Sequence, residues 1–153
     1  MTLRANYYDL ASNAMQMLMD QESYLHAQFN DSATMSIKIW DLVKLRVSQI
    51  NQCAFCIDMH NKEALKQGET QERIIGLSAW HDMPLYSEVE RVALGWAEHL
   101  TAGKAVDDDS YNKVVKVLGE QALVDLTIAI NAINSWNRIS KTFKPEVGGY
   151  KPQ

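Results

Sequence analysis

Interruptions to helical structure are rare in this chain. Glycine and proline, which most often end regular helices, contribute only seven and three of its 153 residues. Most segments between them repeat apolar residues at spacings of three and four, the pattern of a helix with one buried face. No segment alternates convincingly between apolar and polar residues as a strand would. The sequence therefore predicts an all-α fold, a single-domain helical bundle of about six to eight helices over residues 1–153.

Capping residues delimit the expected helices. Serine, threonine and aspartate accept hydrogen bonds from free amides at a helix start, and glycine suits the position just after a helix end. The expected helices run from Tyr7, from Asp31 or Ser32 to about Ile50, from Asn51 or Gln52 to Gly68, from Thr70 to about Trp80, from Ser87 to about Leu100, from Asp107 to Gly119, and from Glu120 to about Phe143.

Two of these helices have faces of contrasting character. In the second, Asp41, Lys44 and Ser48 fall on the side opposite its apolar residues, which predicts a polar face. In the first, apolar residues at helical spacing predict one buried face, formed by Tyr7, Leu10, Ala11, Ala14, Met17 and Leu18.

The overall charge narrows the function classes. The formal net charge is −4 and Lys and Arg form no cluster, so nucleic acid is not an expected partner. The N-terminus lacks the apolar core of a signal peptide, and no apolar run approaches the ~20 residues that span a bilayer. We therefore expect a cytoplasmic protein without membrane contact. In that reducing compartment a close cysteine pair is expected to be catalytic or metal-binding rather than a structural staple.

The most reactive segment contains the only two cysteines, Cys53 and Cys56, followed by His60. At these spacings all three share one helical face, and the free amides at a helix start stabilise a thiolate. The imidazole can accept or return a proton. A thiolate can attack a peroxide, become a sulfenic acid and condense with the other cysteine, after which an outside dithiol reduces the disulfide. This chemistry needs no cofactor, and position alone favours Cys53 as the nucleophile.

Two further roles for the cysteines compete with redox chemistry. Buried free cysteine often acts as a small hydrophobic residue, although chance placement at this spacing beside a histidine is unexpected. A structural zinc site would need a fourth ligand from His26, His81, His99 or a carboxylate. We therefore expect no bound metal.

Three segments resemble the alkylhydroperoxidase D-like, or carboxymuconolactone decarboxylase, superfamily. Residues 41–60 read DLVKLRVSQINQCAFCIDMH, residues 86–98 read YSEVERVALGWAE and residues 133–138 read INSWNR. The resemblance implies an all-helical fold and a homo-oligomer, from trimer to hexamer. Its cysteine-bearing branch implies reduction of organic or hydrogen peroxides, with an external dithiol of lipoyl or thioredoxin type as reductant.

The resemblance also implies a role for each site residue. Cys56 would form the sulfenic acid, while Cys53 would resolve it and supply a proton; this conflicts with the order favoured by position alone. His60 matches the relay histidine. Asp41 stands where a glutamate usually completes the proton relay, twelve residues before the first cysteine.

Three positions depart from the superfamily pattern. Asp41 is one methylene shorter than the usual glutamate, which limits its reach toward His60. Gln52 occupies a position where glycine is common, so the preceding turn either has a different shape or does not require a positive φ. Phe55 replaces the second histidine of the best-known hydroperoxidases, a change that could slow proton delivery.

Two other functions remain open from the sequence. A carboxymuconolactone-type decarboxylase would suit the fold, although such enzymes do not need the cysteine pair. A non-catalytic redox-sensing oligomer would be oxidised once per site without turnover, and its size would change with the disulfide.

Overall fold

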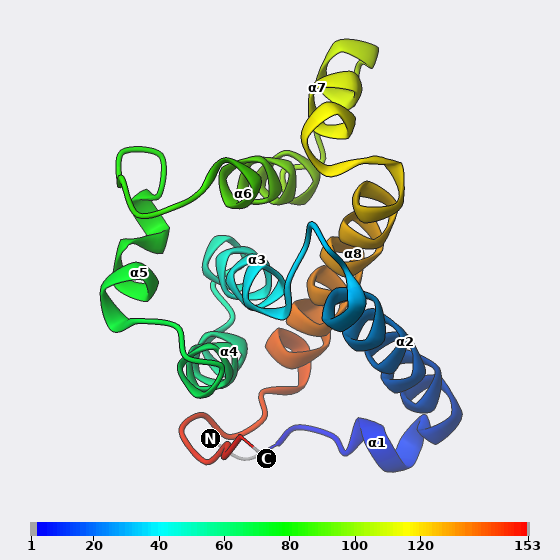
Figure 1. Cartoon of the computed structure of the whole chain (residues 1–153). Helices are drawn as coiled ribbons and strands as arrows, with labels where there is room; N and C mark the ends of the chain where they lie inside the picture. The colour runs from blue at the N-terminus through cyan, green and yellow to red at the C-terminus, as the bar shows by residue number, and fades with distance from the viewer. Residues whose placement is uncertain (1–2, 153) are drawn as a thin grey trace.

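The computed structural model describes residues 3–152, and these residues form helices without a strand (Figure 1). The all-α prediction is confirmed. The elements are α1 (Tyr7–Leu10), α2 (Ser12–Asp31), α3 (Ile37–Ile50), α4 (Ala54–Lys66), α5 (Gln71–Gly76), a 3-10 turn η1 (Leu77–Ala79), α6 (Glu88–Thr101), α7 (Asp108–Leu118) and α8 (Glu120–Phe143).

Helix α3 is the centre of the bundle. It packs against α2, α4, α6 and α8, which surround it in Figure 1. The predicted polar face of α3 is therefore largely enclosed, because Asp41, Lys44 and Ser48 are buried together with the apolar side. Buried polar groups need partners. The Ser48 hydroxyl donates to the Lys44 carbonyl (2.8 Å) and accepts from Asn137 of α8 (3.0 Å).

The start of α3 also differs from the expectation. Asp31 is the last residue of α2, and the Ser32 hydroxyl accepts from the amide of Met35 (2.9 Å) in the turn between the helices. Ser36 is the true cap, and its hydroxyl accepts from the Ile39 amide. Several serines in one stretch can each cap a helix, so composition alone does not select among them.

The later boundaries agree with the capping residues. Thr70 caps α5, and Asp107 caps α7 through a 2.7 Å bond from the Ser110 amide. Ser87 and Glu90 form the reciprocal capping box that opens α6. These local capping patterns therefore predict the starts of α5, α6 and α7 correctly.

The first helical segment is interrupted and exposed. A break at Ala11 separates α1 from α2, and Leu10, Ala11, Ala14 and Met17 are exposed in the single chain. The expected buried face is therefore wrong for these four residues, whereas Tyr7 is buried. The periodicity correctly marks an apolar stripe, but no element within residues 3–152 covers it.

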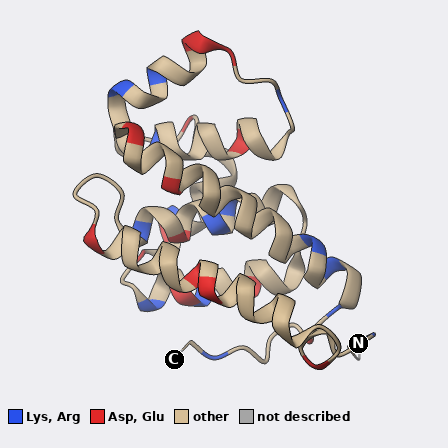
Figure 2. Cartoon of the chain, turned by 90° about the vertical axis from the view of Figure 1, so that its right-hand side faces the viewer, with Lys and Arg blue, Asp and Glu red and all other residues tan. Residues whose placement is uncertain are grey.

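Charged residues are distributed over the surface of the molecule. Basic and acidic residues are interspersed along the helices in the view of Figure 2 rather than gathered on one face. Within residues 3–152, no helix combines the length and apolar character needed to cross a bilayer.

Candidate active site

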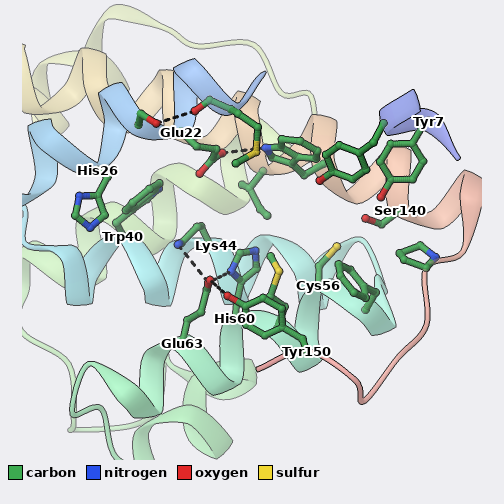
Figure 3. Close-up of a pocket in the computed structure, with 18 of the residues that line it drawn as sticks. Tyr7, Glu22, His26, Trp40, Lys44, Cys56, His60, Glu63, Ser140 and Tyr150 are labelled. Atoms are coloured by element: carbon green, nitrogen blue, oxygen red, sulfur yellow. Dashed lines mark hydrogen bonds and ion pairs between the residues drawn. The ribbon is translucent and has the colours of Figure 1, made fainter. Parts of the chain in front are cut away.

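A cavity of about 810 Å³ lies among α1, α2, α3, α4, α8 and the segment after α8 (Figure 3). Aromatic and aliphatic side chains make up most of its wall, with a few polar groups between them, as is common for small-molecule sites. Its lining residues include Tyr7, Met19, Glu22, His26, Trp40, Lys44, Phe55, Cys56, Met59, His60, Glu63, Ile133, Trp136 and Tyr150.

The two cysteines lie at the start of α4 and are joined by a disulfide. Cys53 is the N-cap rather than a first-turn residue, and its sulfur accepts from the Cys56 amide (3.4 Å). Cys53 and Cys56 are both buried, at 1% and 2% exposure, so exposure gives no support to Cys53 as the nucleophile. Cys56 lines the cavity and Cys53 is not among the lining residues. A small molecule in the cavity therefore meets the Cys56 side of the disulfide.

A left-handed residue directs the chain into α4. Gln52 has a φ of +54°, so the backbone has the conformation for which glycine is favoured, despite the different residue. The following amide, from Cys53, donates to the Ser48 carbonyl at 3.0 Å. This turn joins α3 to α4 within three residues and places Cys53 at the helix end.

His60 and Glu63 form a polar pair that begins one turn beyond Cys56 on α4. The Nδ1 atom of His60 lies 2.8 Å from Oε2 of Glu63, one turn along the same helix face. Burial lowers the pKa of His60, and the hydrogen bond to Glu63 opposes that effect. Burial raises the pKa of Glu63, but the bond from His60 and the Lys44 charge outweigh it and lower the pKa to about 2.

This pair defines the state of the imidazole. An ionised Glu63 can only accept, so Nδ1 of His60 carries the hydrogen. A neutral His60 then has its lone pair on Nε2, which forms no hydrogen bond among residues 3–152. That nitrogen is available as a base on the wall of the cavity.

Asp41 lies behind this pair rather than in contact with His60. Its Oδ1 pairs with Nζ of Lys44 (3.0 Å), and Nζ lies 3.7 Å from Oε2 of Glu63. Burial raises the pKa of Asp41, opposed by the Lys44 charge. Its Oδ2 is buried without a partner among the described residues. Lys44 and Glu63 therefore stand between Asp41 and the imidazole.

Sequence reasoning missed four polar residues of the cavity. Glu63 could have been found from its position three residues after His60 on one helix. Lys44 falls on the predicted polar side of α3, and periodicity does not show that this side faces a cavity. Glu22 accepts from the Trp136 indole (3.0 Å), and burial raises its pKa. Tyr150 comes from the segment after the last helix, and no local pattern links it to the site.

The remaining histidines are spread over the molecule. His26 lines the cavity, His81 contacts Glu98 at 3.1 Å, and His99 contacts the Ala105 carbonyl. Within residues 3–152, no three His, Cys, Asp or Glu side chains are arranged to hold a metal ion.

Comparison with known proteins identifies the class to which this fold and site belong. The model of the carboxymuconolactone decarboxylase family matches residues 36–99, which include the whole cysteine motif. The chain belongs to this family, and the superfamily resemblance is confirmed.

Individual relatives share most of the chain. The uncharacterized protein YdfG of Bacillus subtilis is 44% identical over 142 residues, which cover 92% of this chain and 93% of YdfG. A solved structure from Agrobacterium tumefaciens is 34% identical with a TM-score of 0.86, covering 97% of this chain and all of that one. It is described as a protein of unknown function and a candidate antioxidant defence protein AhpD. An uncharacterized peroxidase-related protein from Silicibacter sp. TM1040 has the same fold at 16% identity, with a TM-score of 0.77, covering 90% of this chain and 72% of its own.

Proposed function

We propose that the protein is a thiol-dependent peroxidase that reduces organic or hydrogen peroxides through a Cys53–Cys56 disulfide cycle. The observation that carries this proposal is the cysteine pair at a helix start, with Cys56 on the wall of a large cavity beside the His60–Glu63 pair. The description of the Agrobacterium relative as an antioxidant defence protein agrees with it.

The proposed cycle has three steps: oxidation of Cys56, formation of the disulfide and its reduction. Nε2 of His60 takes the Cys56 proton, and the thiolate attacks one peroxide oxygen, which breaks the O–O bond. The leaving alkoxide, or hydroxide from hydrogen peroxide, takes that proton from His60 and becomes an alcohol or water, and Cys56 becomes a sulfenic acid. The Cys53 thiol then attacks that sulfur, which forms the disulfide and releases water. An external dithiol restores both thiols and becomes oxidised itself.

The cavity supports Cys56 as the residue that attacks the peroxide. A peroxide held there reaches Cys56. The Cys53 sulfur lies at the helix start instead, where it accepts a hydrogen bond from the Cys56 amide. Asp41 would act in the relay only through Lys44 and Glu63, as a more distant member than the superfamily resemblance implies.

The charges around the cavity favour a peroxide over a carboxymuconolactone. One buried cation, Lys44, faces the carboxylates of Asp41 and Glu63, and Glu22 lies on the same wall. A lactone bearing carboxylates would enter a site whose only nearby cation among residues 3–152 is already paired with two acids. An uncharged organic peroxide avoids that repulsion and buries its apolar part against aromatic side chains.

The proposed reductant and setting follow from the chemistry. Both cysteines are buried, so the reductant must bring a slender dithiol into the cavity, as a lipoyl arm can; a thioredoxin-type partner is the other candidate. A reducing compartment such as the cytoplasm would supply either one.

We also propose that the protein is a homo-oligomer, from trimer to hexamer. Ala14, Met17 and Tyr24 recur along one stripe of α2, and Leu10 of α1 precedes Met17 by seven residues. Leu10 is 79% exposed, Met17 72% and Tyr24 46%. Exposed apolar stripes of this kind mark interaction surfaces, and we assign this one to a second copy of the chain.

The test begins with the reduced protein and one equivalent of cumene hydroperoxide. Intact and peptide masses, followed over seconds to minutes, are expected to show loss of two hydrogens mapped to a Cys53–Cys56 disulfide. Cys53→Ser should stop at the sulfenic acid on Cys56, whereas Cys56→Ser should not react. With excess dihydrolipoamide, the wild type should consume many equivalents of peroxide.

Different outcomes would assign the rival functions. Stoichiometric oxidation without turnover, together with a change in hydrodynamic size, would indicate the redox-sensing oligomer instead. Unreactive thiols, combined with lactone conversion by a double Cys→Ala variant, would indicate the decarboxylase. A reactive Cys56→Ser protein would overturn the assignment of Cys56.

A further inference from the structure

The segment after α8 folds back onto the helix that carries the cysteines. Nζ of Lys62 donates to the carbonyls of Gly148 (3.0 Å) and Tyr150 (3.1 Å), and it also pairs with Asp58 (2.9 Å). The Gly148 amide donates to the same carboxylate of Asp58 at 3.2 Å. Two side chains one turn apart on α4 thus hold the backbone of residues 148–150.

This attachment delivers one phenol to the polar pair of the cavity. The Tyr150 hydroxyl donates to Oε1 of Glu63 at 2.7 Å, while Oε2 of the same carboxylate faces Nδ1 of His60 at 2.8 Å (Figure 3). Each carboxylate oxygen therefore has a different donor. Burial and the Glu63 charge raise the pKa of Tyr150 to about 12, so the phenol stays a donor at neutral pH.

We propose that Tyr150 is a positioning residue for His60. Its hydroxyl fixes the rotamer of Glu63, so that Oε2 stays on Nδ1 of His60 and the ring keeps its hydrogen there. The lone pair is thereby held on Nε2, toward the cavity. Lys62 and Asp58 position Tyr150 by anchoring the backbone of its segment.

The other charged groups near His60 do not replace this contact. Lys44 approaches Oε2 of Glu63 at 3.7 Å from α3, and Asp41 pairs with Lys44. Lys44 therefore acts on the oxygen already facing the imidazole, and Asp41 acts only through Lys44. Among residues 3–152, only Tyr150 donates a hydrogen bond to Oε1. Removal of the Tyr150 hydroxyl therefore leaves the Glu63 carboxylate free to rotate.

The first test reads the imidazole directly and does not depend on peroxidase activity. In ¹⁵N spectra of the protein at neutral pH, His60 is expected to show a single tautomer with hydrogen on Nδ1. Tyr150→Phe removes only the hydroxyl and should convert His60 to a tautomer mixture. Tyr111→Phe, on the distant helix α7, should leave the His60 signals unchanged.

The second test removes the contacts that Lys62 makes with the backbone of residues 148–150. Lys62→Met should release the segment and shift the His60 tautomer in the same direction as Tyr150→Phe. Lys66→Met, four residues further along α4 and exposed, is the matched control and should have no effect.

The kinetic consequence rests on the proposed function. Loss of one such hydrogen bond should slow disulfide formation at saturating cumene hydroperoxide about fivefold in Tyr150→Phe, with little change in KM. An unchanged His60 tautomer in Tyr150→Phe would overturn the inference, whatever the rate. A shifted tautomer in a protein that does not reduce peroxides would uphold the inference and overturn the peroxidase proposal.

Discussion

Lys44 balances the charges behind the cavity. Its ammonium lies 3.0 Å from Asp41 and 3.7 Å from Glu63, and it also sits 3.9 Å from the centre of the Trp40 ring. Side chains of Lys44 and Asp41 are only 10% and 4% exposed. A buried carboxylate keeps its charge only while such a cation is present.

Removal of that cation should destabilise the fold through Asp41. Lys44→Met is expected to lower the free energy of unfolding by about 3 kcal/mol, because Asp41 is left buried and unpaired. Asp41→Asn in the same protein should recover much of the loss, a coupling that a double-mutant cycle in urea measures. Lys38→Met, at an exposed position of the same helix, is the control. Additive effects of the two substitutions would contradict this account.

The buried imidazole should make stability depend on pH. The pKa of His60 in the folded protein is below its ordinary 6.5, mainly through burial, so the unfolded chain binds the extra proton between those two values. Stability contributed by neutral His60 is present above pH 6.5 and is lost as the pH falls toward the lowered value. Glu63, with a pKa of about 2, stays ionised throughout this range.

His60→Gln should therefore flatten the pH dependence of stability. Urea unfolding from pH 7.5 to 5.5 is expected to show a slope reduced by up to about 1.4 kcal/mol per pH unit relative to wild type. Parallel curves for the two proteins would show that His60 does not resist protonation in the fold.

Single residues can be assigned from sequence only where the partner is local. The cysteine pair and His60 share a short motif, so their placement on one helix follows from spacing. The contact of Asp41 with Lys44 rather than His60 depends on how α3 and α4 pack. Tyr150 is 87 residues from Glu63 and meets it only because the segment after α8 returns to α4.

The turn between α3 and α4 contains Gln52, which with Lys144 is one of the two non-glycine residues of positive φ among residues 3–152. Gln52 adopts φ +54° although its side chain is exposed, so the conformation has no evident compensation from side-chain burial. A left-handed conformation costs a non-glycine residue about 1–2 kcal/mol. Glycine avoids this cost, but it loses more conformational entropy on folding, which offsets part of the gain.

Gln52→Gly should stabilise the protein by roughly 0.5–1 kcal/mol in urea unfolding. Gln67→Gly is the matched control, because Gln67 also ends a helix but has φ −76°. Glycine there should destabilise by a similar amount. A loss of stability at both positions would mean that the Gln52 side chain contributes contacts that outweigh its strain.

The positions of the helices along the chain can be predicted from this sequence, whereas the elements that pack against each helix cannot. Capping patterns at Thr70, Ser87 and Asp107 locate the starts correctly because the hydrogen bonds are local. The burial of the polar side of α3 could not be predicted, because four helices cover this element and periodicity cannot show how many neighbours a helix has.

Across the whole molecule, the exposed stripe on α1 and α2 should control assembly. Met17→Lys places a charge in its middle and is expected to reduce the particle mass toward the monomer in light scattering. Ile75→Lys, on α5 with a comparable exposure of 76%, should leave the mass unchanged. A monomeric wild type would contradict the proposed homo-oligomer. A particle mass that changes only with Ile75→Lys would show that the interface lies on α5 and not on this stripe.

Two of the four tryptophans, Trp40 and Trp136, lie on the wall of the cavity. Disulfides quench indole emission by accepting an electron from the excited ring, and thiols do so more weakly. The protein thus carries its own optical probe, in which the emission intensity reports the sulfur oxidation state and the wavelength reports what fills the cavity. Reduction, oxidation and ligand entry could be timed in a stopped-flow fluorimeter without any label.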